Sequence, residues 1–348
     1  MDPSINLQKN FFRKQLVLIG GGHANIQVLK KLCMNFYEGL HTILINNSLN
    51  GVYSGMTPSY IQNEYEYDQI TIDLQRLCFN AGATFINDEV IKLDTKLKKI
   101  NLSNRPSIYY DLLSINTGSI SKISNIKIHK NAKYILVKPI NELVKRIELI
   151  DQITQKNPTA NICMIGGGIA AFEISFALFE RYGSKISIKI ISQNALSEKN
   201  INSKSAKTLL NISKKMGIKI VDNNVKEIMS SHIKLTNNET IQSDLNLISS
   251  GAELPNWLLN SSLEKIDGYI GVDNKLLSIN DENIFASGDA ASVVGSVRSK
   301  SGVMAVRHGE ILKENIFLKL QNKNLKKIKL QKKWLFIIGT YKKKALLN

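Results

Sequence analysis

Two segments of this 348-residue chain share one design, in which an apolar strand leads directly into three glycines. They are QLVLIGGG at residues 15–22 and NICMIGGG at residues 161–168, and the second fits the Gly-x-Gly-x-x-Ala pattern through Gly166, Gly168 and Ala171. Glycine permits a tight turn and lets backbone N–H groups approach a pyrophosphate at the start of the next helix. The sequence therefore predicts two strand–turn–helix units, each able to hold a dinucleotide.

The first glycine turn departs from the usual pattern at one position. Asn25 stands where a third glycine is usual, so a side chain must fit there between the helix and the sheet. Apolar residues recur at helical spacing after the turn, and the helix is expected to bury Ile26, Leu29, Leu32 and Cys33.

Polar residues follow the second strand of each expected unit. A dinucleotide fold usually presents an acid there to the ribose hydroxyls, but the strand His41–Ile45 ends before Asn46, Asn47 and Ser48. We expect an amide or a hydroxyl to replace the acid. The strand Ile186–Ile191 is followed by Ser-Gln-Asn, which offers neither an acid for NAD nor an arginine for the 2′-phosphate of NADP. The choice between NADH and NADPH is left open.

Repeated strand endings indicate how the two units are joined. The segments DLLSINTG at 111–118 and DLNLISSG at 244–251 both resemble crossover strands, which places one dinucleotide unit inside the other. A strand at 284–286 then leads to a Gly-Asp turn, and a helix is expected from about Gly302 to Leu320. Asp289 can accept a hydrogen bond from a polyol hydroxyl. The same sequence also fits an ordinary aspartate at a helix N-cap. We predict an α/β protein with two Rossmann-like dinucleotide-binding domains.

Composition excludes several other classes of protein. No apolar run reaches the length of a membrane span, and the N-terminus lacks the apolar core of a signal peptide, so a cytoplasmic protein is expected. The net charge of +17 comes from lysines spread along the chain without a zinc-finger or aromatic-basic motif, which argues against nucleic-acid binding.

Cys33, Cys78 and Cys163 form no C-x-x-C pair, so a redox-active disulfide is excluded and no metal site is predicted. Cys33 and Cys163 are expected to act as small buried apolar residues.

The order of these features resembles the two-dinucleotide flavoproteins of the pyridine nucleotide-disulfide oxidoreductase superfamily. Four shorter segments narrow the resemblance: GGGHAN at 20–25, YSGMTP at 53–58, VKPI at 137–140 and KSGVMAVRHG at 300–309. They are similar to segments of NADH dehydrogenase-like flavoproteins, which occur alone or fused ahead of selenide, water dikinase and are related to type II NADH dehydrogenases. Relative to these proteins, Asn25 replaces a histidine and His308 replaces a glutamine.

The resemblance implies an FAD domain at 1–118 and 253–320, an inserted NAD(P)H domain at 119–252 and a C-terminal interface segment at 321–348. It implies hydride transfer from NAD(P)H to the flavin, with electrons passed on to a quinone or another small acceptor. Glu173 matches an acid that approaches the nicotinamide, and Lys300, Arg307 and His308 are expected to be positive donors near the flavin, so Glu173, Lys300 and His308 are the candidate catalytic residues. The expected cofactor contacts are Gly20, Gly21, Gly22, His23, Ala24, Asn46, Ser54, Gly55, Met56, Thr117, Gly118, Gly166, Gly168, Gly251, Gly288 and Asp289.

Alternative interpretations are a flavoprotein that serves docking or regulation in selenium metabolism, through the dikinase, and an enzyme like sulfide:quinone oxidoreductase. The positions of the cysteines argue against the latter. The apolar block Trp334–Ile338 lies between lysine-rich segments. A segment that binds the inner face of the plasma membrane and a buried strand both explain this pattern, so peripheral membrane contact is a second open question.

Overall fold

The computed structural model describes residues 14–35, 37–197, 201–295, 302–328, 337–342 and 344–347, and it divides into two compact units. Unit 1 holds the N-terminal strand and helix, Ile72–Gly118, and the chain from Leu254 through the last long helix. Unit 2 holds Val52–Thr71, Ser119–Glu253 and a C-terminal hairpin. The division differs from the expected domains because residues 52–71 and the hairpin group with the inserted unit.

Unit 1 is built on a sheet in the order β21-β22-β23-β24-β9-β1-β2-β5, with β25 paired to β22. The run from β24 to β5 is parallel. A second sheet has the order β6-β7-β8. The strands of unit 1 are β1 (Lys14–Ile19), β2 (Leu40–Asn46), β5 (Thr84–Asn87), β6 (Val90–Asp94), β7 (Lys99–Leu102), β8 (Ile108–Tyr109), β9 (Leu112–Ile115), β21 (Lys265–Ile266), β22 (Tyr269–Val272), β23 (Leu277–Ser278), β24 (Asp281–Ala286) and β25 (Ala291–Val293).

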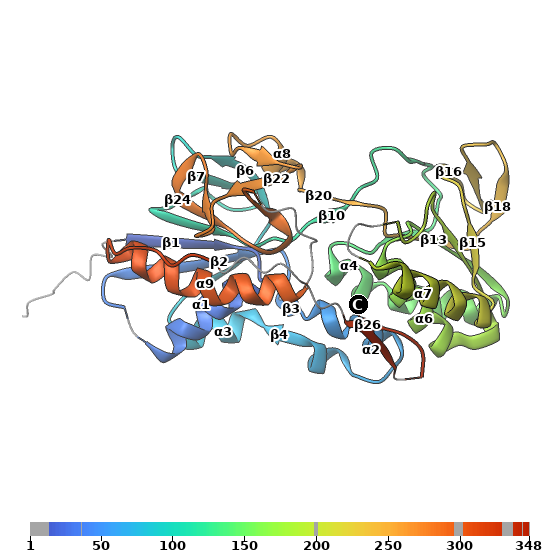
Figure 1. Ribbon diagram of the computed structural model, residues 1–348. Helices are drawn as coiled ribbons and strands as arrows, with labels where there is room; N and C mark the ends of the chain where they lie inside the picture. Colours follow the sequence, from blue (N-terminus) through green and yellow to red (C-terminus); the bar gives the residue numbers. More distant parts are fainter. Residues whose placement is uncertain are drawn as a thin grey trace, which may run out of the picture. The chain divides into compact units, whose positions relative to one another are not determined.

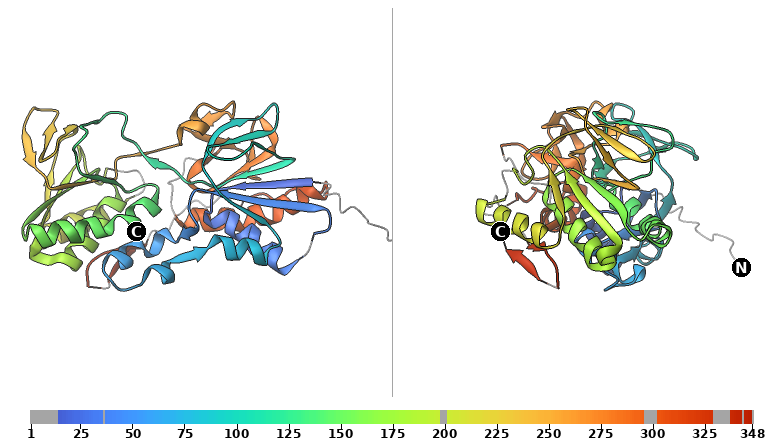
Figure 2. Two further views of the ribbon diagram at one scale, coloured as in Figure 1. Left: turned by 180° about the vertical axis from the view of Figure 1, so that it is seen from behind. Right: turned by 90° about the vertical axis from the view of Figure 1, so that its right-hand side faces the viewer.

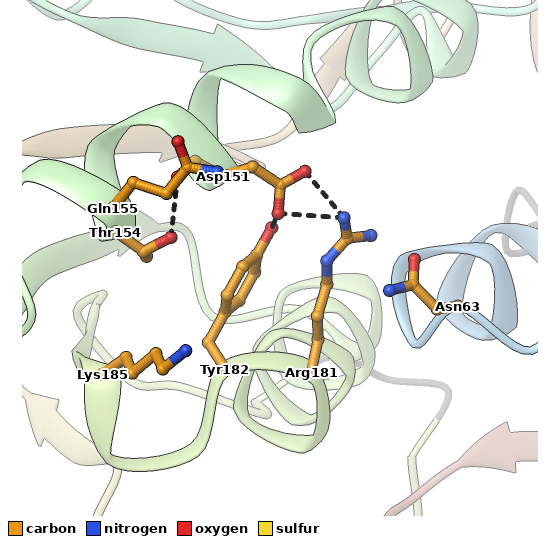
Figure 3. Close-up of a pocket in the computed structure, with 7 residues that line it drawn as sticks. All are labelled: Asn63, Asp151, Thr154, Gln155, Arg181, Tyr182 and Lys185. Carbon is orange, nitrogen blue, oxygen red and sulfur yellow. Dashed lines mark hydrogen bonds and ion pairs between the residues drawn. The ribbon is translucent and has the colours of Figure 1, made fainter.

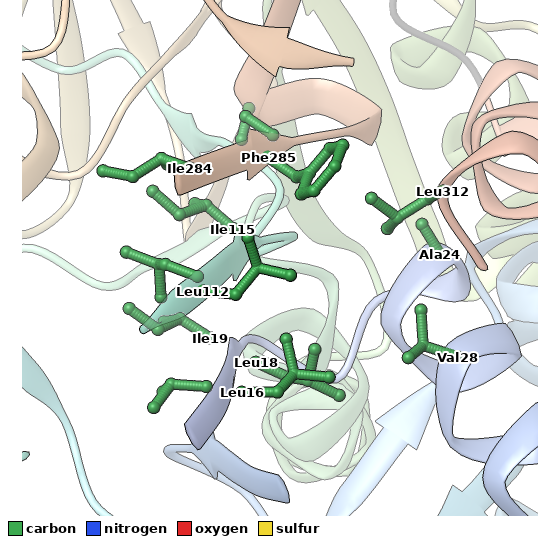
Figure 4. Packing of buried hydrophobic residues seen from close by; sticks show 14 of the residues in the cluster. Leu16, Leu18, Ile19, Ala24, Val28, Leu112, Ile115, Ile284, Phe285 and Leu312 are labelled. Carbon is green, nitrogen blue, oxygen red and sulfur yellow. The ribbon is translucent and has the colours of Figure 1, made fainter. Parts of the chain in front are cut away.

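Helices α1, α3 and α9 cover one face of this sheet, and the β6-β7-β8 sheet, with α8 beside β6, covers the other (Figure 1). The helical segments are α1 (His23–Met34), α3 (Leu74–Asn80), α8 (Asn256–Leu259), η4 (Gly288–Ala290) and α9 (Gly302–Leu320). Helices α1 and α9 pack against each other, and Ala24, Val28 and Leu312 bring their side chains into one core with the central strands (Figure 4). The expected helix at 302–320 is thus found with those bounds.

Unit 2 repeats this layering around a parallel sheet in the order β12-β19-β13-β14-β15 (Figure 2). Alternate residues of β13 face opposite layers, as a strand requires. Ile162 and Met164 belong to the core shared with the helices, while Cys163 and Ile165 pack with a second sheet, β11-β16-β17-β18. The strands are β10 (Ile120–Ser121), β11 (Lys127–Ile128), β12 (Tyr134–Leu136), β13 (Ala160–Ile165), β14 (Ile186–Ile191), β15 (Lys219–Val221), β16 (Val225–Ile228), β17 (His232–Leu235), β18 (Thr240–Gln242), β19 (Leu245–Ile248) and β20 (Ala252–Glu253).

The helices of unit 2 explain why the segment 52–71 belongs to it. Helix α2 packs against α6, and the Arg181 side chain of α6 donates a hydrogen bond to the Ile61 carbonyl oxygen at the end of α2 (3.2 Å). The paired strands β3 (Asn50–Val52) and β4 (Thr71–Asp73) carry the chain between the units. The helical segments are η1 (Ser54–Met56), α2 (Thr57–Ile61), η2 (Tyr67–Ile70), α4 (Ile140–Lys145), α5 (Ile147–Lys156), α6 (Ile169–Tyr182), η3 (Gly183–Lys185) and α7 (Ser203–Lys215).

The cysteines correct one expectation. Cys33 is exposed, because the buried stripe of α1 runs through Asn25, Val28, Leu29 and Leu32 and leaves residue 33 on the solvent side. Cys163 is buried between the two sheets of unit 2, as expected, and burial raises the pKa of its thiol. Burial raises the pKa of Cys78 to about 12. No helix among the described residues is long and apolar enough to cross a membrane.

Asn25 occupies the position of the usual third glycine, and its side chain forms hydrogen bonds there. The side chain is fully buried, and its amide nitrogen donates to the carbonyl oxygens of Ile19 (3.1 Å) and Gly20 (2.9 Å). Its amide oxygen accepts a hydrogen bond from the buried Ser114 hydroxyl of β9 (2.7 Å). The side chain therefore joins α1 to the ends of β1 and β9, where glycine would only permit close packing.

We predict that Asn25→Ala lowers the free energy of unfolding by about 2–4 kcal/mol, because it removes three buried hydrogen bonds and leaves the Gly20 carbonyl oxygen and the Ser114 hydroxyl without this partner, while the Ile19 carbonyl oxygen still accepts from the Asn116 amide. Urea unfolding of the variant measures the change. Ser114→Ala is the matched control and should lower the stability less, since Asn25 keeps both of its donated bonds. Equal stability of Asn25→Ala and the unmodified protein would contradict the bracing role of this side chain.

Candidate functional site

The two glycine turns have the same geometry in both units. The amide of Gly20 donates to the Ile45 carbonyl oxygen and that of Gly166 to the Ile191 carbonyl oxygen, each at 2.9 Å. The residues before α1 and α6, Gly22 and Gly168, have nearly identical torsions (φ −77° with ψ 169° and 171°). One local backbone design therefore serves both strand–turn–helix units.

No side chain fits at the first glycine of either turn. A Cβ on Gly20 would lie 2.5 Å from the Asn116 carbonyl oxygen, and a Cβ on Gly166 would lie 2.5 Å from the Ser249 carbonyl oxygen. Both glycines also have positive φ (+90° and +119°), which an L side chain rarely adopts. The turn is thus pressed against the end of the neighbouring strand, β9 in unit 1 and β19 in unit 2.

The sheet order places each turn where a nucleotide binds in such folds. Strand β1 lies between β2 and β9, and β13 lies between β14 and β19. In each unit the strand that follows the glycine turn is added on one side of the first strand, and a later strand is added on its other side. Ligands of open parallel sheets bind at this reversal, beyond the carboxyl ends of the strands. Each unit therefore carries one candidate dinucleotide cradle.

Asn116, which the sequence analysis did not single out, connects the parts of the first cradle. Its side-chain oxygen accepts from the amides of Ala24 (3.0 Å) and Asn25 (3.4 Å), and its side-chain nitrogen donates to the Ser287 carbonyl oxygen (3.0 Å). Thr117 and Gly118 follow directly, and Gly118 has a φ of +72°. The polar residue that ends the apolar strand DLLSI was the available signal for Asn116.

The Gly-Asp turn lies in the same unit. Gly288 has a φ of +63°, and a Cβ there would lie 2.8 Å from the Asn116 amide nitrogen. Asp289 lies in η4, close enough to His23 that its carboxylate raises the pKa of the imidazole, although burial has the larger effect and lowers it. The buried hydroxyl of Ser287 has no hydrogen-bond partner among the described residues.

His308 differs from the positive donor that was expected. It is buried, and its Nδ1 accepts a hydrogen bond from the Gly288 amide (3.1 Å), so this nitrogen carries no proton. The imidazole is then neutral and supports the Gly-Asp turn from α9. Arg307 is exposed, and Lys300 lies outside the described residues.

Asn46 contacts the first turn as well. Its side-chain oxygen accepts from the Gly21 amide (2.9 Å), and its side-chain nitrogen donates to the Ser48 carbonyl oxygen (2.7 Å). The amide that stands in for the usual acid therefore braces the loop, and its contact with ribose stays a prediction. Ser54, Gly55 and Met56 form η1 of unit 2, and their contact with FAD stays a prediction too.

The second cradle is bordered by the loop after β14. A Cβ on Gly167 would lie 2.5 Å from the Ser192 hydroxyl, and the Gly167 carbonyl oxygen accepts from the Leu196 amide (2.9 Å). The Asn194 amide donates to the Asp222 carboxylate (2.8 Å), which follows β15. Gly251, an expected contact, is exposed after β19 with a φ of +51°.

Glu173 lies near the start of α6, five residues after Gly168. One oxygen of its carboxyl group accepts a hydrogen bond from the Gly339 amide of the C-terminal hairpin (2.8 Å). Burial raises the pKa of Glu173 to about 7, and the bond from Gly339 acts in the opposite direction. The group can therefore hold or release a proton near neutral pH.

The far end of α6 borders a separate polar cavity of about 260 Å³, which α5, η3 and Asn63 also line (Figure 3). Asp151 accepts hydrogen bonds from the Arg181 guanidinium (2.7 and 2.9 Å) and from the Tyr182 hydroxyl (2.8 Å). A helix of this length spans about 20 Å, so the cavity is not part of the cradle at the start of α6. Its charged pair joins α5, α6 and the end of α2.

Comparison with known proteins identifies the family. A family model described as pyridine nucleotide-disulphide oxidoreductase matches residues 14–309. The chain belongs to this family. Its members are FAD- and NAD(P)H-dependent oxidoreductases, so the predicted family, α/β fold and cofactors are confirmed.

Individual relatives are distant. A probable NADH dehydrogenase of Dictyostelium discoideum is 25% identical over 313 residues, which cover 80% of this chain and 68% of that protein. The fold is similar to NDH2 from Plasmodium falciparum in complex with NADH (TM-score 0.78, 15% identity, 96% of this chain and 89% of that one). It is also similar to a NAD-dependent persulfide reductase from A. fulgidus (TM-score 0.78, 17% identity), where the match covers 94% of this chain but only 62% of that one.

The residues present fit these cofactors. Each turn ends in a glycine, Gly22 or Gly168, at the start of a helix, where the lack of a side chain lets a pyrophosphate approach the backbone, although the amides of Gly21 and Ala24 donate to Asn46 and Asn116. In unit 1, the Asp289 carboxylate and the Ser287 hydroxyl lie in one turn and suit the hydroxyls of a polyol. The turn at Gly20–Gly22 therefore suits FAD and the turn at Gly166–Gly168 suits the nicotinamide nucleotide, and these contacts stay predictions that the resemblance implies.

We predict that Gly22→Ala reduces FAD binding at least tenfold, because the new Cβ would collide with the Asn116 side chain and lie 2.6 Å from its carbonyl oxygen. The flavin-to-protein absorbance ratio after purification and a titration of the apoprotein with FAD measure the loss. Gly82→Ala is the matched control, since Gly82 also belongs to unit 1 and has a φ of +63° but nothing within 4 Å of the added Cβ. Full flavin retention in Gly22→Ala would remove this turn from the FAD site.

Glu173 predicts a pH effect on stability. Its pKa is raised in the folded protein, so the unfolded chain releases this proton first and the folded state loses stability as pH rises from about 4.5 to about 7. Glu173→Gln should avoid this loss and be more stable than the unmodified protein above pH 7, by up to about 3 kcal/mol. Urea unfolding at pH 5 and pH 8 measures the difference, with the exposed Glu239→Gln as control. The same pH dependence in Glu173→Gln and the unmodified protein would contradict the raised pKa.

Proposed function

We propose that this protein is an FAD-dependent NAD(P)H dehydrogenase that passes electrons to a quinone or another small acceptor. The observation that carries the proposal is the pair of equivalent glycine turns, one in each unit, at the reversal points of two parallel sheets. Two cradles in one chain suit a resident flavin and an exchanging nicotinamide nucleotide. The name of the Dictyostelium discoideum relative, a probable NADH dehydrogenase, supports the same reaction class.

In such a reaction the cofactors supply the hydride chemistry, and the protein supplies binding, orientation and electrostatics. The helix starts that follow Gly22 and Gly168 would bind the pyrophosphates. Asp289 would hold the flavin polyol, while His308 fixes the turn that carries it through the bond from Gly288. Glu173 would lie at the nicotinamide and, with a pKa of about 7, hold a proton on its carboxyl group over part of the physiological pH range.

The cysteines argue against the chemistry of a sulfide:quinone oxidoreductase, which uses reactive thiolates. Burial raises the pKa of both Cys78 and Cys163, so these side chains stay thiols at neutral pH. Cys33 is exposed on α1, and its sulfur lies 3.9 Å from the Leu77 carbonyl oxygen. The described residues therefore provide no pair of activated thiolates.

An anaerobic absorbance titration tests the proposed reaction. Bleaching of the flavin by NADH or NADPH, followed by recovery on adding a soluble quinone, is the expected result and identifies the donor. A bound flavin that neither nucleotide reduces would reject the dehydrogenase and favour a docking or regulatory role. Bleaching without recovery by quinone would retain the NAD(P)H half of the reaction and exclude quinone as the acceptor.

We predict that Asp289→Ala raises the Kd of FAD about ten- to hundredfold, because it deletes hydrogen bonds to a charged acceptor that contribute about 1.5–3 kcal/mol. Asp289→Asn, which keeps one acceptor oxygen and the same shape, should bind FAD with an affinity between that of Asp289→Ala and that of the unmodified protein. Quenching of flavin fluorescence on reconstitution of the apoprotein measures both values. Unchanged FAD affinity in Asp289→Ala would show that this carboxylate does not contact the flavin.

A further inference from the structure

The C-terminal hairpin lies outside residues 14–309, the part of the chain that the family model matches. It consists of the antiparallel strands β26 (Ile337–Gly339) and β27 (Ala345–Leu347). Ile338 is 1% exposed and belongs to the hydrophobic core that α5, α6 and β13 share, and Tyr341 and Leu346 pack against the same core. The hairpin is thus an integral part of unit 2.

The pairing of the two strands leaves the backbone amide of Gly339 directed away from the ladder. The Thr340 amide donates to the Lys344 carbonyl oxygen (2.8 Å), and paired residues in an antiparallel ladder alternate between hydrogen-bonded and non-hydrogen-bonded pairs. Gly339 and Ala345 therefore form a non-hydrogen-bonded pair. The Gly339 amide points out of the hairpin and donates to Glu173 of α6 at 2.8 Å.

Two causes set the proton affinity of Glu173, and they oppose each other. Burial disfavours the carboxylate, while the Gly339 amide stabilises it because a donated hydrogen bond favours the charged form. Among the described residues, no ionisable side chain of α6, of the elements packed against it or of the hairpin is one of these causes. These side chains are Glu180, Arg181 and Tyr182 of α6, Tyr60 of α2, Cys163 of β13, Lys189 of β14, Lys185 of η3, the lysines 204, 207, 214 and 215 of α7, and Tyr341, Lys342 and Lys344.

We propose that the β26–β27 hairpin is a positioning element of the nicotinamide-nucleotide site, which fixes the Glu173 carboxylate through the Gly339 amide and thereby favours oxidised over reduced nucleotide. The inference rests on the proposed function, in which Glu173 lies at the nicotinamide. The oxidised ring carries a positive charge and the reduced ring is neutral, so a carboxylate beside it strengthens binding of NAD⁺ and leaves NADH nearly unaffected. The hairpin thus tunes the balance between the two nucleotides.

The matched variants are Gly339→Pro and Gly339→Ala. Proline removes the amide hydrogen at a position that donates nothing to the ladder, where a strand tolerates proline best. Alanine keeps the amide, and its Cβ would lie 3.5 Å from the Glu173 oxygen, an ordinary van der Waals contact. The difference between the two variants therefore isolates the hydrogen bond.

The first measurement is the pKa of the Glu173 carboxyl group, by ¹³C NMR of glutamate-labelled full-length holoprotein with Glu173→Gln used for assignment. The pKa should rise in Gly339→Pro and stay unchanged in Gly339→Ala. The second is the ratio of the Kd values for NAD⁺ and NADH at pH 7. We expect NAD⁺ to bind roughly three- to tenfold more weakly to Gly339→Pro, with the NADH affinity unchanged.

Glu173→Gln gives a test that leaves the hairpin intact, because its amide oxygen still accepts from Gly339. The ratio of the two Kd values should lose its dependence on pH between 6 and 8 in this variant. Equal carboxyl pKa values in Gly339→Pro and Gly339→Ala, or a pH-dependent ratio that survives in Glu173→Gln, would overturn the inference. Failure of the proposed function has a different signature, since the flavin of the unmodified protein would then not bleach with either reduced nucleotide.

Discussion

The structure depends on a close approach between backbones at the two glycine turns. Gly20 lies against the Asn116 carbonyl group and Gly166 against that of Ser249, with no room for a Cβ in either place. This contact lets the turn at the end of one strand meet the end of the next strand in the sheet. In unit 1 it brings together residues 20–24, 116–118 and 288–289, which are far apart in the sequence, because the order β24-β9-β1 places their strands side by side.

Local patterns in the sequence predict most of this framework. The apolar runs before the glycines, the strand at 186–191 and the helix at 302–320 are found with the expected or nearly the expected bounds. The roles of Asn116 and His308 could not be predicted in this way, because each depends on partners that lie far away in the sequence, in α1 or at the Gly-Asp turn. The prediction that Cys33 is buried was wrong, because the spacing of apolar residues does not show that the buried Asn25 belongs to the buried face of α1.

The two ends of α6 show how differently a carboxyl group can be held in one small domain. Near the C-terminal end, Asp151 of α5 accepts from both Arg181 and Tyr182, so its charge is matched within the protein. Near the N-terminal end, Glu173 receives one backbone amide, and burial has the larger effect on its pKa. The first arrangement joins helices together. The second leaves the charge state open to whatever binds beside it, which is the property that a functional site requires.

The hydrogen bond between Asn25 and Ser114 also constrains how this chain can change over evolutionary time. Glycine at position 25 would leave the Ser114 hydroxyl buried without its acceptor, and an apolar residue at 114 would leave the Asn25 oxygen in the same state. The two positions therefore tolerate substitution mainly as a pair. A sequence pattern that demands glycine at position 25 would pass over this chain, whereas one that accepts asparagine there together with a hydroxyl on the neighbouring strand would match it.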